Sequence, residues 1–116
     1  MVKYIAILKT YQDILQFAHW NTSKEYASHL LFERLMNDIP DLLDRFVEVY
    51  MGSKDTVYVS YDEFKKINID NKEGGLKEFI QEAKLEFKAL LADSDETIQN
   101  VVVDILEMFD RHLYLL

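Results

Sequence analysis

The sequence predicts an all-helical domain, and three features of its 116 residues support this fold class. Three glycines and one proline make turn residues rare, and 49% of the residues are hydrophobic. The apolar residues recur at three- and four-residue steps, which is the spacing of an amphipathic helix. The length suits one domain with a moderate core, so we expect residues 1–116 to form a single helical domain.

The first predicted helix runs from Tyr4 to about Thr22. Its apolar stripe consists of Tyr4, Ile7, Leu8, Tyr11, Ile14, Leu15 and Ala18, and His19 continues it. A turn is expected after Asn21, with Ser23 as the cap that begins the next helix.

The second helix is expected to extend to about Met51 and to end at Gly52, a favoured stop residue. Pro40 interrupts it, because proline has no N–H to donate to the carbonyl one turn earlier. We expect a mild kink there. The alternative is a sharp division, with Asp38 capping the second half.

A long connection over residues 53–72 comes next, with a β-prone patch at 56–59. The capping box Ser60-x-x-Glu63 predicts a short helix to about Ile67 within it. Gly74-Gly75 precedes a third long helix, and residues 93–96 cap a fourth. The two apolar stripes contain Leu76, Phe79, Ile80, Ala83, Phe87, Leu90 and Leu91, and then Ile98, Val101, Val102, Ile105, Leu106, Phe109 and Leu113. This connectivity predicts a ferritin-like four-helix bundle with a crossover.

Charge and composition narrow the function classes. The formal net charge of -8 disfavours phosphate neutralisation, so DNA binding is not expected and a cation is the better-matched partner. No stretch approaches the roughly 18 apolar residues of a membrane span, and the N-terminal stretch lacks a signal-peptide cleavage site. We therefore expect a cytoplasmic protein with no membrane contact.

Four metal-type residues have mirror spacing on the second predicted helix: His29-x3-Glu33 is followed by Asp44-x3-Glu48. At about 100° per residue they share one helix face, but about 16 Å separates Glu33 from Asp44 along the axis. A second, antiparallel copy would bring His29 and Glu33 against the other copy's carboxylate pair, forming two equivalent sites. The spacing therefore predicts a homodimer with shared metal sites.

Imidazole nitrogen together with carboxylate oxygen suits iron, manganese or zinc, and the chain has no cysteine to supply thiolate ligands. No Glu has a His three residues later, so the di-iron site built inside one ferritin-like subunit is not expected. His112 is expected to interact with the last carbonyls of the final helix.

These residues resemble a known family, the Dps-like miniferritins of the ferritin-like superfamily. The resemblance rests on His19-Trp20-Asn21, on His29-x3-Glu33 and Asp44-x3-Glu48, and on the crossover with its short helix. It implies that His19, His29 and Glu33 are ligands from one subunit and that Asp44 and Glu48 complete the site from its two-fold mate. It also implies oxidation of ferrous iron by peroxide or dioxygen, iron storage and a hollow dodecamer.

The chain departs from the family pattern in three places. The His19 to His29 spacing is two residues shorter and lacks a Gly-Pro turn, and Glu33 stands where Asp is common. The lysine-rich arm that some members use on DNA is also missing ahead of the first helix, so we expect no DNA protection of that kind.

A rival hypothesis is a noncatalytic helical interaction or scaffold protein that keeps the ferritin-like scaffold without iron oxidation. Trp20 suits either the core or an interface, or a role in intercepting oxidising equivalents. The same alternatives hold for Tyr4, Tyr11, Tyr26 and Tyr50.

Overall fold

The computed structural model describes residues 1–55, 59–67, 69 and 75–116. Within this part the regular elements are helices: α1 (Val2–Asn21), α2 (Tyr26–Asn37), α3 (Ile39–Ser53), α4 (Tyr61–Lys66), α5 (Leu76–Ala92) and α6 (Glu96–Leu115). The predicted all-helical class is confirmed. Most of the β-prone patch, residues 56–58, lies outside the described residues, as does Gly74.

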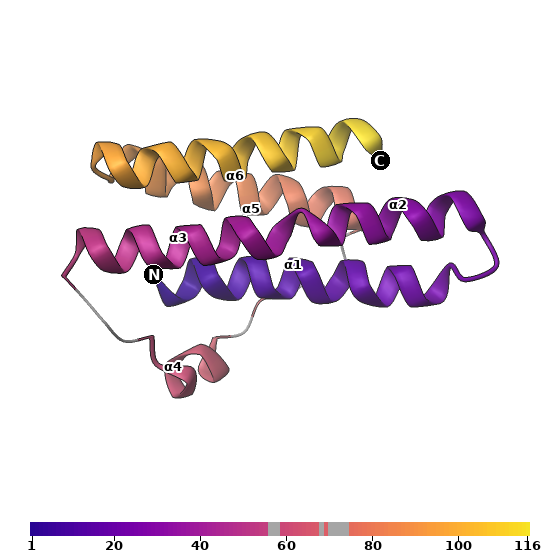
Figure 1. The fold of residues 1–116 in the computed structure, drawn as a ribbon, viewed down its shortest axis with the longest axis horizontal. Coiled ribbons are helices and arrows are strands. Elements are labelled where there is room, and N and C mark those ends of the chain that lie inside the picture. Colours follow the sequence, from indigo (N-terminus) through magenta and orange to yellow (C-terminus); the bar gives the residue numbers. More distant parts are fainter. Residues whose placement is uncertain (56–58, 68, 70–74) are drawn as a thin grey trace.

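The long helices lie alongside one another (Figure 1). Helix α1 packs against α2, α3 and α5, and α6 packs against α5 and α3. Helix α4 lies to one side, in the connection between α3 and α5, and contacts α1. None of the helices in the described ranges combines the length and the apolar character that crossing a membrane requires.

Aromatic side chains from four helices meet in the core. Phe87 of α5 lies 5.4 Å from Tyr4 of α1, 6.0 Å from Phe46 of α3 and 6.0 Å from Phe109 of α6, measured between ring centroids. Each such pair adds about 0.5–1.5 kcal/mol beyond the burial of its area. Phe87 therefore holds the four helices to a common centre.

The turn between α1 and α2 is longer than the sequence predicted. Helix α2 begins at Tyr26 with Glu25 at its N-cap position, so the prediction that Ser23 starts this helix is wrong. The reason lies at Thr22, whose hydroxyl donates to the Ala18 carbonyl at 2.8 Å. Its own carbonyl accepts from the Glu25 N–H at 2.9 Å, and these bonds extend the turn to residue 25.

The second predicted helix is interrupted at Asp38, next to Pro40, with little change of direction. Helix α2 ends at Asn37 and α3 begins at Ile39, but Asp38 keeps helical backbone angles, with φ -73 and ψ -15. The two helices follow nearly one line in Figure 1, as expected for a mild kink. Asp38 occupies the N-cap position without a side-chain capping bond.

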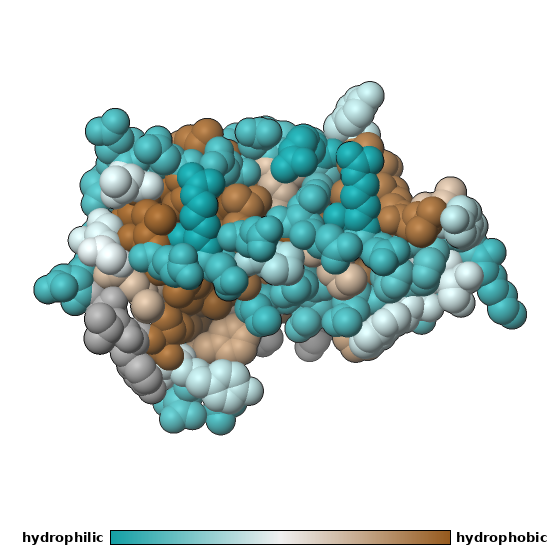
Figure 2. All heavy atoms as spheres, viewed as in Figure 1, coloured by the Kyte–Doolittle hydropathy of each residue, from teal (hydrophilic) through white to brown (hydrophobic). Residues whose placement is uncertain are grey.

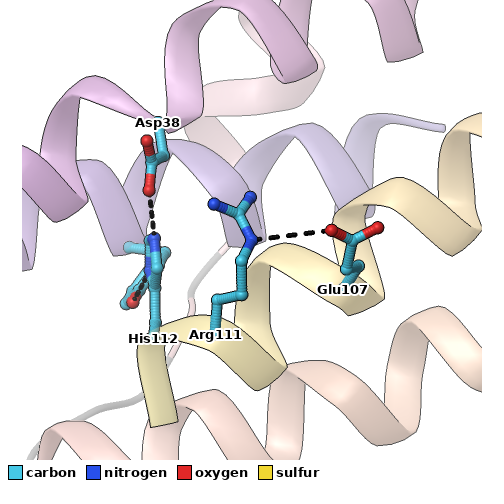
Figure 3. Close-up of polar contacts among 5 residues, drawn as sticks. Asp38, Glu107, Arg111 and His112 are labelled. Atoms are coloured by element: carbon cyan, nitrogen blue, oxygen red, sulfur yellow. Dashed lines mark hydrogen bonds and ion pairs between the residues drawn. The ribbon is translucent and has the colours of Figure 1, made fainter. Parts of the chain in front are cut away.

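The Asp38 carboxylate is instead bound by His112, which is fully buried. The Nε2 of His112 lies 2.8 Å from the Asp38 carboxylate (Figure 3). Its Nδ1 lies 2.6 Å from the hydroxyl of Tyr11 in α1. The prediction that His112 caps the last carbonyls is wrong. Position 112 lies on the inward face of α6 with Met108 and Phe109, so its ring enters the core.

Burial lowers the pKa of His112, the Asp38 carboxylate opposes that effect, and Arg111 and Arg34 add to the lowering. Arg111 itself points to Glu107 (Figure 3). The unfolded chain, with a histidine pKa of about 6.5, then binds the proton more tightly than the folded chain. The contribution of neutral His112 to the free energy of unfolding is therefore fully present above the pKa of the unfolded chain. It is lost as the pH falls below that value.

Urea denaturation of the native chain at pH 7.5 and 5.5 is expected to show a lower free energy of unfolding at the acidic pH, because buried His112 must become charged. The variant His112→Gln lacks this titration, so it is expected to lose less stability over the same interval. His19 and His29 are common to both proteins. Equal losses of unfolding free energy in the two proteins would contradict the assignment of this pH dependence to His112.

Two leucines of α5 provide a matched test of the core. Leu90 is buried, whereas Leu85 is 67% exposed. We expect Leu90→Ala to lower the free energy of unfolding by about 2–5 kcal/mol, because it leaves a cavity. Leu85→Ala makes the same change in helix propensity at the surface and is expected to have a small effect. Chemical denaturation of both variants checks this, and comparable losses would argue against the packing described.

Candidate metal site

Two of the predicted ligands, His19 and His29, face each other across the turn between α1 and α2. His19 lies in the last turn of α1, and His29 lies one turn into α2. Their rings stack with centroids 3.8 Å apart and planes inclined by 19°. Both side chains are half-buried. The extended turn after Thr22 thus brings together two imidazoles that are separated by ten residues.

Each histidine is bonded to the backbone of the other. The Nδ1 of His19 lies 3.0 Å from the His29 carbonyl oxygen, and the Nδ1 of His29 lies 2.7 Å from the His19 carbonyl oxygen. A carbonyl only accepts hydrogen bonds, so both Nδ1 atoms carry a proton, and in the neutral form of each ring the lone pair is on Nε2. Metal-binding histidines commonly have this tautomer, with Nδ1–H held by a carbonyl.

The ring stacking limits how these lone pairs can be used. A lone pair on Nε2 lies in the plane of its ring, and the two planes are nearly parallel. The two lone pairs therefore do not converge on one ion. In this arrangement each ring is suited to an ion of its own.

The three predicted carboxylates, Glu33, Asp44 and Glu48, are exposed. Glu33 lies one turn beyond His29 in α2, whereas Asp44 and Glu48 lie on α3, past the Asp38 junction. Glu48 borders a surface groove between α3 and α6, together with Val49 and Asn100. Within the described residues, no three His, Asp or Glu side chains of one chain gather closely enough to hold a metal ion. The structure thus pairs the histidines and leaves the carboxylates apart from them.

Large apolar side chains are exposed at the same end of the molecule. Phe17, Trp20, Tyr26 and Leu30 are each more than one-third exposed, and the first two rings pack edge to face at 5.3 Å. Hydrophobic side chains also reach the surface near this end in Figure 2. Trp20 is 55% exposed, so it is not a core residue of the single chain. Its placement at an interface stays a prediction.

Comparison with known proteins places the chain in a family. Residues 19–116 match the model of a family of unknown function, DUF5856. The chain belongs to this family. It is also 28% identical over 115 residues to a protein of Enterobacteria phage T4 described as an uncharacterized 14.6 kDa protein in the mobD-ri intergenic region. That match covers 98% of this chain and 85% of the phage protein. No solved structure matches the chain.

Sequence reasoning chose His19 and His29 as ligands but did not anticipate that each binds the other's backbone. Their positions, at the end of one helix and one turn into the next, indicate that the two side chains lie close together, because a short turn brings such positions together. The buried group made by Tyr11, Asp38 and His112 was also missed. Its signal is the placement of Tyr11 and His112 on the apolar stripes of their helices.

Two replacements of His29 separate the structural hydrogen bond made by Nδ1 from the predicted metal binding by Nε2. Asparagine carries an N–H donor near the position of Nδ1 and nothing at Nε2, so His29→Asn is expected to keep the bond to the His19 carbonyl. His29→Ala loses that bond, which is worth about 1 kcal/mol, and is expected to be the less stable variant although alanine is the better helix former. Guanidinium denaturation of the two variants measures the difference. An alanine variant more stable than the asparagine variant by the full difference in helix propensity, up to about 0.7 kcal/mol, would mean that the bond contributes nothing to joining α1 and α2.

Proposed function

We propose that this chain is an iron-binding, ferritin-like protein that oxidises ferrous iron at a dinuclear site shared by two copies. The observation that carries the proposal is the state of His19 and His29, whose Nδ1–H groups are held by carbonyls and whose Nε2 lone pairs are left for an ion. Two stacked rings, each suited to its own ion, fit a dinuclear site.

The proposed partner is a second, antiparallel copy, related by a two-fold axis near residues 38–39, where α2 passes into α3. Under this symmetry His29 of one copy lies opposite Glu48 of the other, and Glu33 lies opposite Asp44. The near-linear course of α2 and α3 supports this pairing, as does the exposure of all three carboxylates in the single chain. Facing carboxylates repel each other unless a cation lies between them, so the ion itself would stabilise the interface.

Apolar residues fit the same symmetry. Leu30 of one copy would lie opposite Val47 of the other, and exposed Tyr26 opposite Met51. Val47 and Met51 are half-buried in the single chain and therefore keep some apolar surface for a partner. Such an interface would cover part of the apolar surface beside the histidine pair.

Each group of this chain has a defined part in the proposed reaction. The Nε2 atoms of His19 and His29 bind ferrous ions, and the carboxylates of Glu33, Asp44 and Glu48 favour the higher charge of ferric iron. Each ferrous ion gives one electron to dioxygen or peroxide. The net charge of -8 raises the local concentration of the cation. Manganese and zinc share the ligand preference and are competing metals.

The proposal includes a ferritin-like four-helix bundle over residues 1–116, made of α1, α2 with α3, α5 and α6, with α4 in the crossover. A higher oligomer such as a dodecamer, storing ferric iron in the cytoplasm without DNA or membrane contact, extends the same proposal. The observed order of helices and their packing support the bundle.

A noncatalytic interaction or scaffold protein is the second candidate, and two observations favour it. The histidine pair joins α1 to α2 through its own hydrogen bonds, which is a sufficient structural role. The exposed apolar surface formed by Phe17, Trp20, Tyr26 and Leu30 suits a protein partner without any metal.

Mixed oligomers of two inactive variants test the shared site. One variant carries His19→Asn and His29→Asn, and the other carries Asp44→Asn and Glu48→Gln. Each alone is expected to oxidise ferrous iron no faster than buffer, measured by ferric absorbance. After unfolding and refolding together, half of the dimers are expected to be mixed and to hold one intact site, since one copy supplies histidines and the other carboxylates.

The native chain is therefore expected to be most active, and the mixture to regain about one quarter of its activity. Zero activity in the native chain would leave the scaffold protein as the better explanation. Activity in the native chain without recovery in the mixture would place any metal site within one subunit. Mass measurement in solution provides the control that each variant still associates.

A further inference from the structure

The buried group of Tyr11, His112 and Asp38 takes no part in the proposed metal site. Tyr11 and His112 are fully buried, and Asp38 is partly exposed where α2 meets α3. The Tyr11 ring stacks on Phe79, with centroids 5.8 Å apart, and packs on Phe109 at 5.3 Å. The phenol is therefore enclosed by apolar rings, and its hydroxyl is bonded to His112.

The chemistry of Asp38 fixes the direction of both hydrogen bonds. A carboxylate accepts, so the Nε2–H of His112 donates to Asp38 at 2.8 Å. The Nδ1 of the neutral ring then carries a lone pair, and the Tyr11 O–H donates to it at 2.6 Å. Burial favours this neutral ring and lowers the pKa of His112. The result is a phenol donating to a base that is itself oriented by a carboxylate.

Nucleophilic chemistry does not fit this group, because no substrate reaches a fully buried hydroxyl. Burial also raises the pKa of Tyr11, so the phenol keeps its proton at neutral pH. Electron transfer, however, needs no contact with a substrate. A phenol gives up an electron far more easily when its proton can move at the same time to a bonded base.

We propose that Tyr11 is a redox-active tyrosine whose proton passes to His112 when it gives one electron to an oxidant. The Tyr11 O–H bond breaks, an N–H bond forms at His112 Nδ1, and a neutral tyrosyl radical faces an imidazolium paired with the Asp38 carboxylate. The electron reduces an oxidant of the hydroxyl-radical class to hydroxide. Return of an electron to the ring and of the proton to its oxygen restores the starting state.

The location of Tyr11 suits such a role. It lies eight residues before His19 on α1, which is about 12 Å along the helix, short enough for electron tunnelling. Hydroxyl radicals arise where peroxide meets ferrous iron, so the use of this tyrosine in the cell rests on the proposed function. In the part of the chain that the structure describes, no other tyrosine hydroxyl bonds to a histidine.

Photo-oxidation of the metal-free protein tests the redox step by itself. Flash-generated tris(bipyridine)ruthenium(III) removes one electron, and electron paramagnetic resonance detects a tyrosyl radical. The native chain is expected to give a long-lived neutral radical that disappears in Tyr11→Phe. The matched control is Tyr114→Phe on α6, where the ring is 88% exposed, and it is expected to keep the signal.

Two further variants test the proton acceptor. In His112→Asn an amide oxygen still accepts from Tyr11 but does not take its proton, so radical formation is expected to be at least about tenfold slower, or about 1.4 kcal/mol in barrier. Asp38→Asn keeps both the Tyr11 and the His112 ring and is also expected to slow radical formation. If Tyr11→Phe does not fold, the rate in Asp38→Asn tests the proposal in its place. Circular dichroism checks folding.

An unchanged radical in Tyr11→Phe would overturn the proposal. Equal rates in the native chain, His112→Asn and Asp38→Asn would do the same and would leave the group with a purely structural role. Because no metal is present, neither failure bears on iron oxidation. With ferrous iron and peroxide, Tyr11→Phe is expected to accumulate more oxidised methionine and tryptophan than the native chain, measured by mass spectrometry, and equal damage would count against the cellular role.

Discussion

The buried imidazole of His112 is the constraint that holds the junction between α2 and α3 in place. Its ring bonds to Tyr11 of α1 and to Asp38 at the α2–α3 junction, so one side chain from α6 joins three segments of the chain. A buried imidazole without partners would be costly, and here both nitrogens are satisfied. The junction, and with it the spacing between the two halves of the mirror motif, is fixed from inside the molecule.

Local signals in the sequence were enough for most of the fold. Apolar spacing predicted the long helices. The hydroxyl of Ser60 accepts from the Glu63 N–H at the start of α4, as the capping box indicated, and Asp95 accepts from the Ile98 N–H at the start of α6. Contacts between residues distant in sequence were not accessible in this way. Tyr11 and His112 are 101 residues apart, and no local pattern specifies that their helices place these two positions side by side.

The candidate site was predictable to a similar extent. Spacing and residue type selected His19 and His29, and the structure does bring them together. The sequence pattern could not reveal the hydrogen bonds between the two histidines. These bonds depend on a turn that Thr22 extends through its own hydroxyl and carbonyl. The carboxylates are a different case, since Asp44 and Glu48 lie apart from the histidines in one chain, and the role proposed for them depends on a second copy.

The interruption at Asp38 has a mechanical consequence. Asp38 belongs to the helical backbone and is at the same time the hydrogen-bond partner of a buried ring from α6. His29 and Glu33 belong to α2, whereas Asp44 and Glu48 belong to α3, beyond the break beside Pro40. A change in the angle between α2 and α3 would have to stretch the buried bond between His112 and Asp38, so the core of the molecule sets the angle between the two helices.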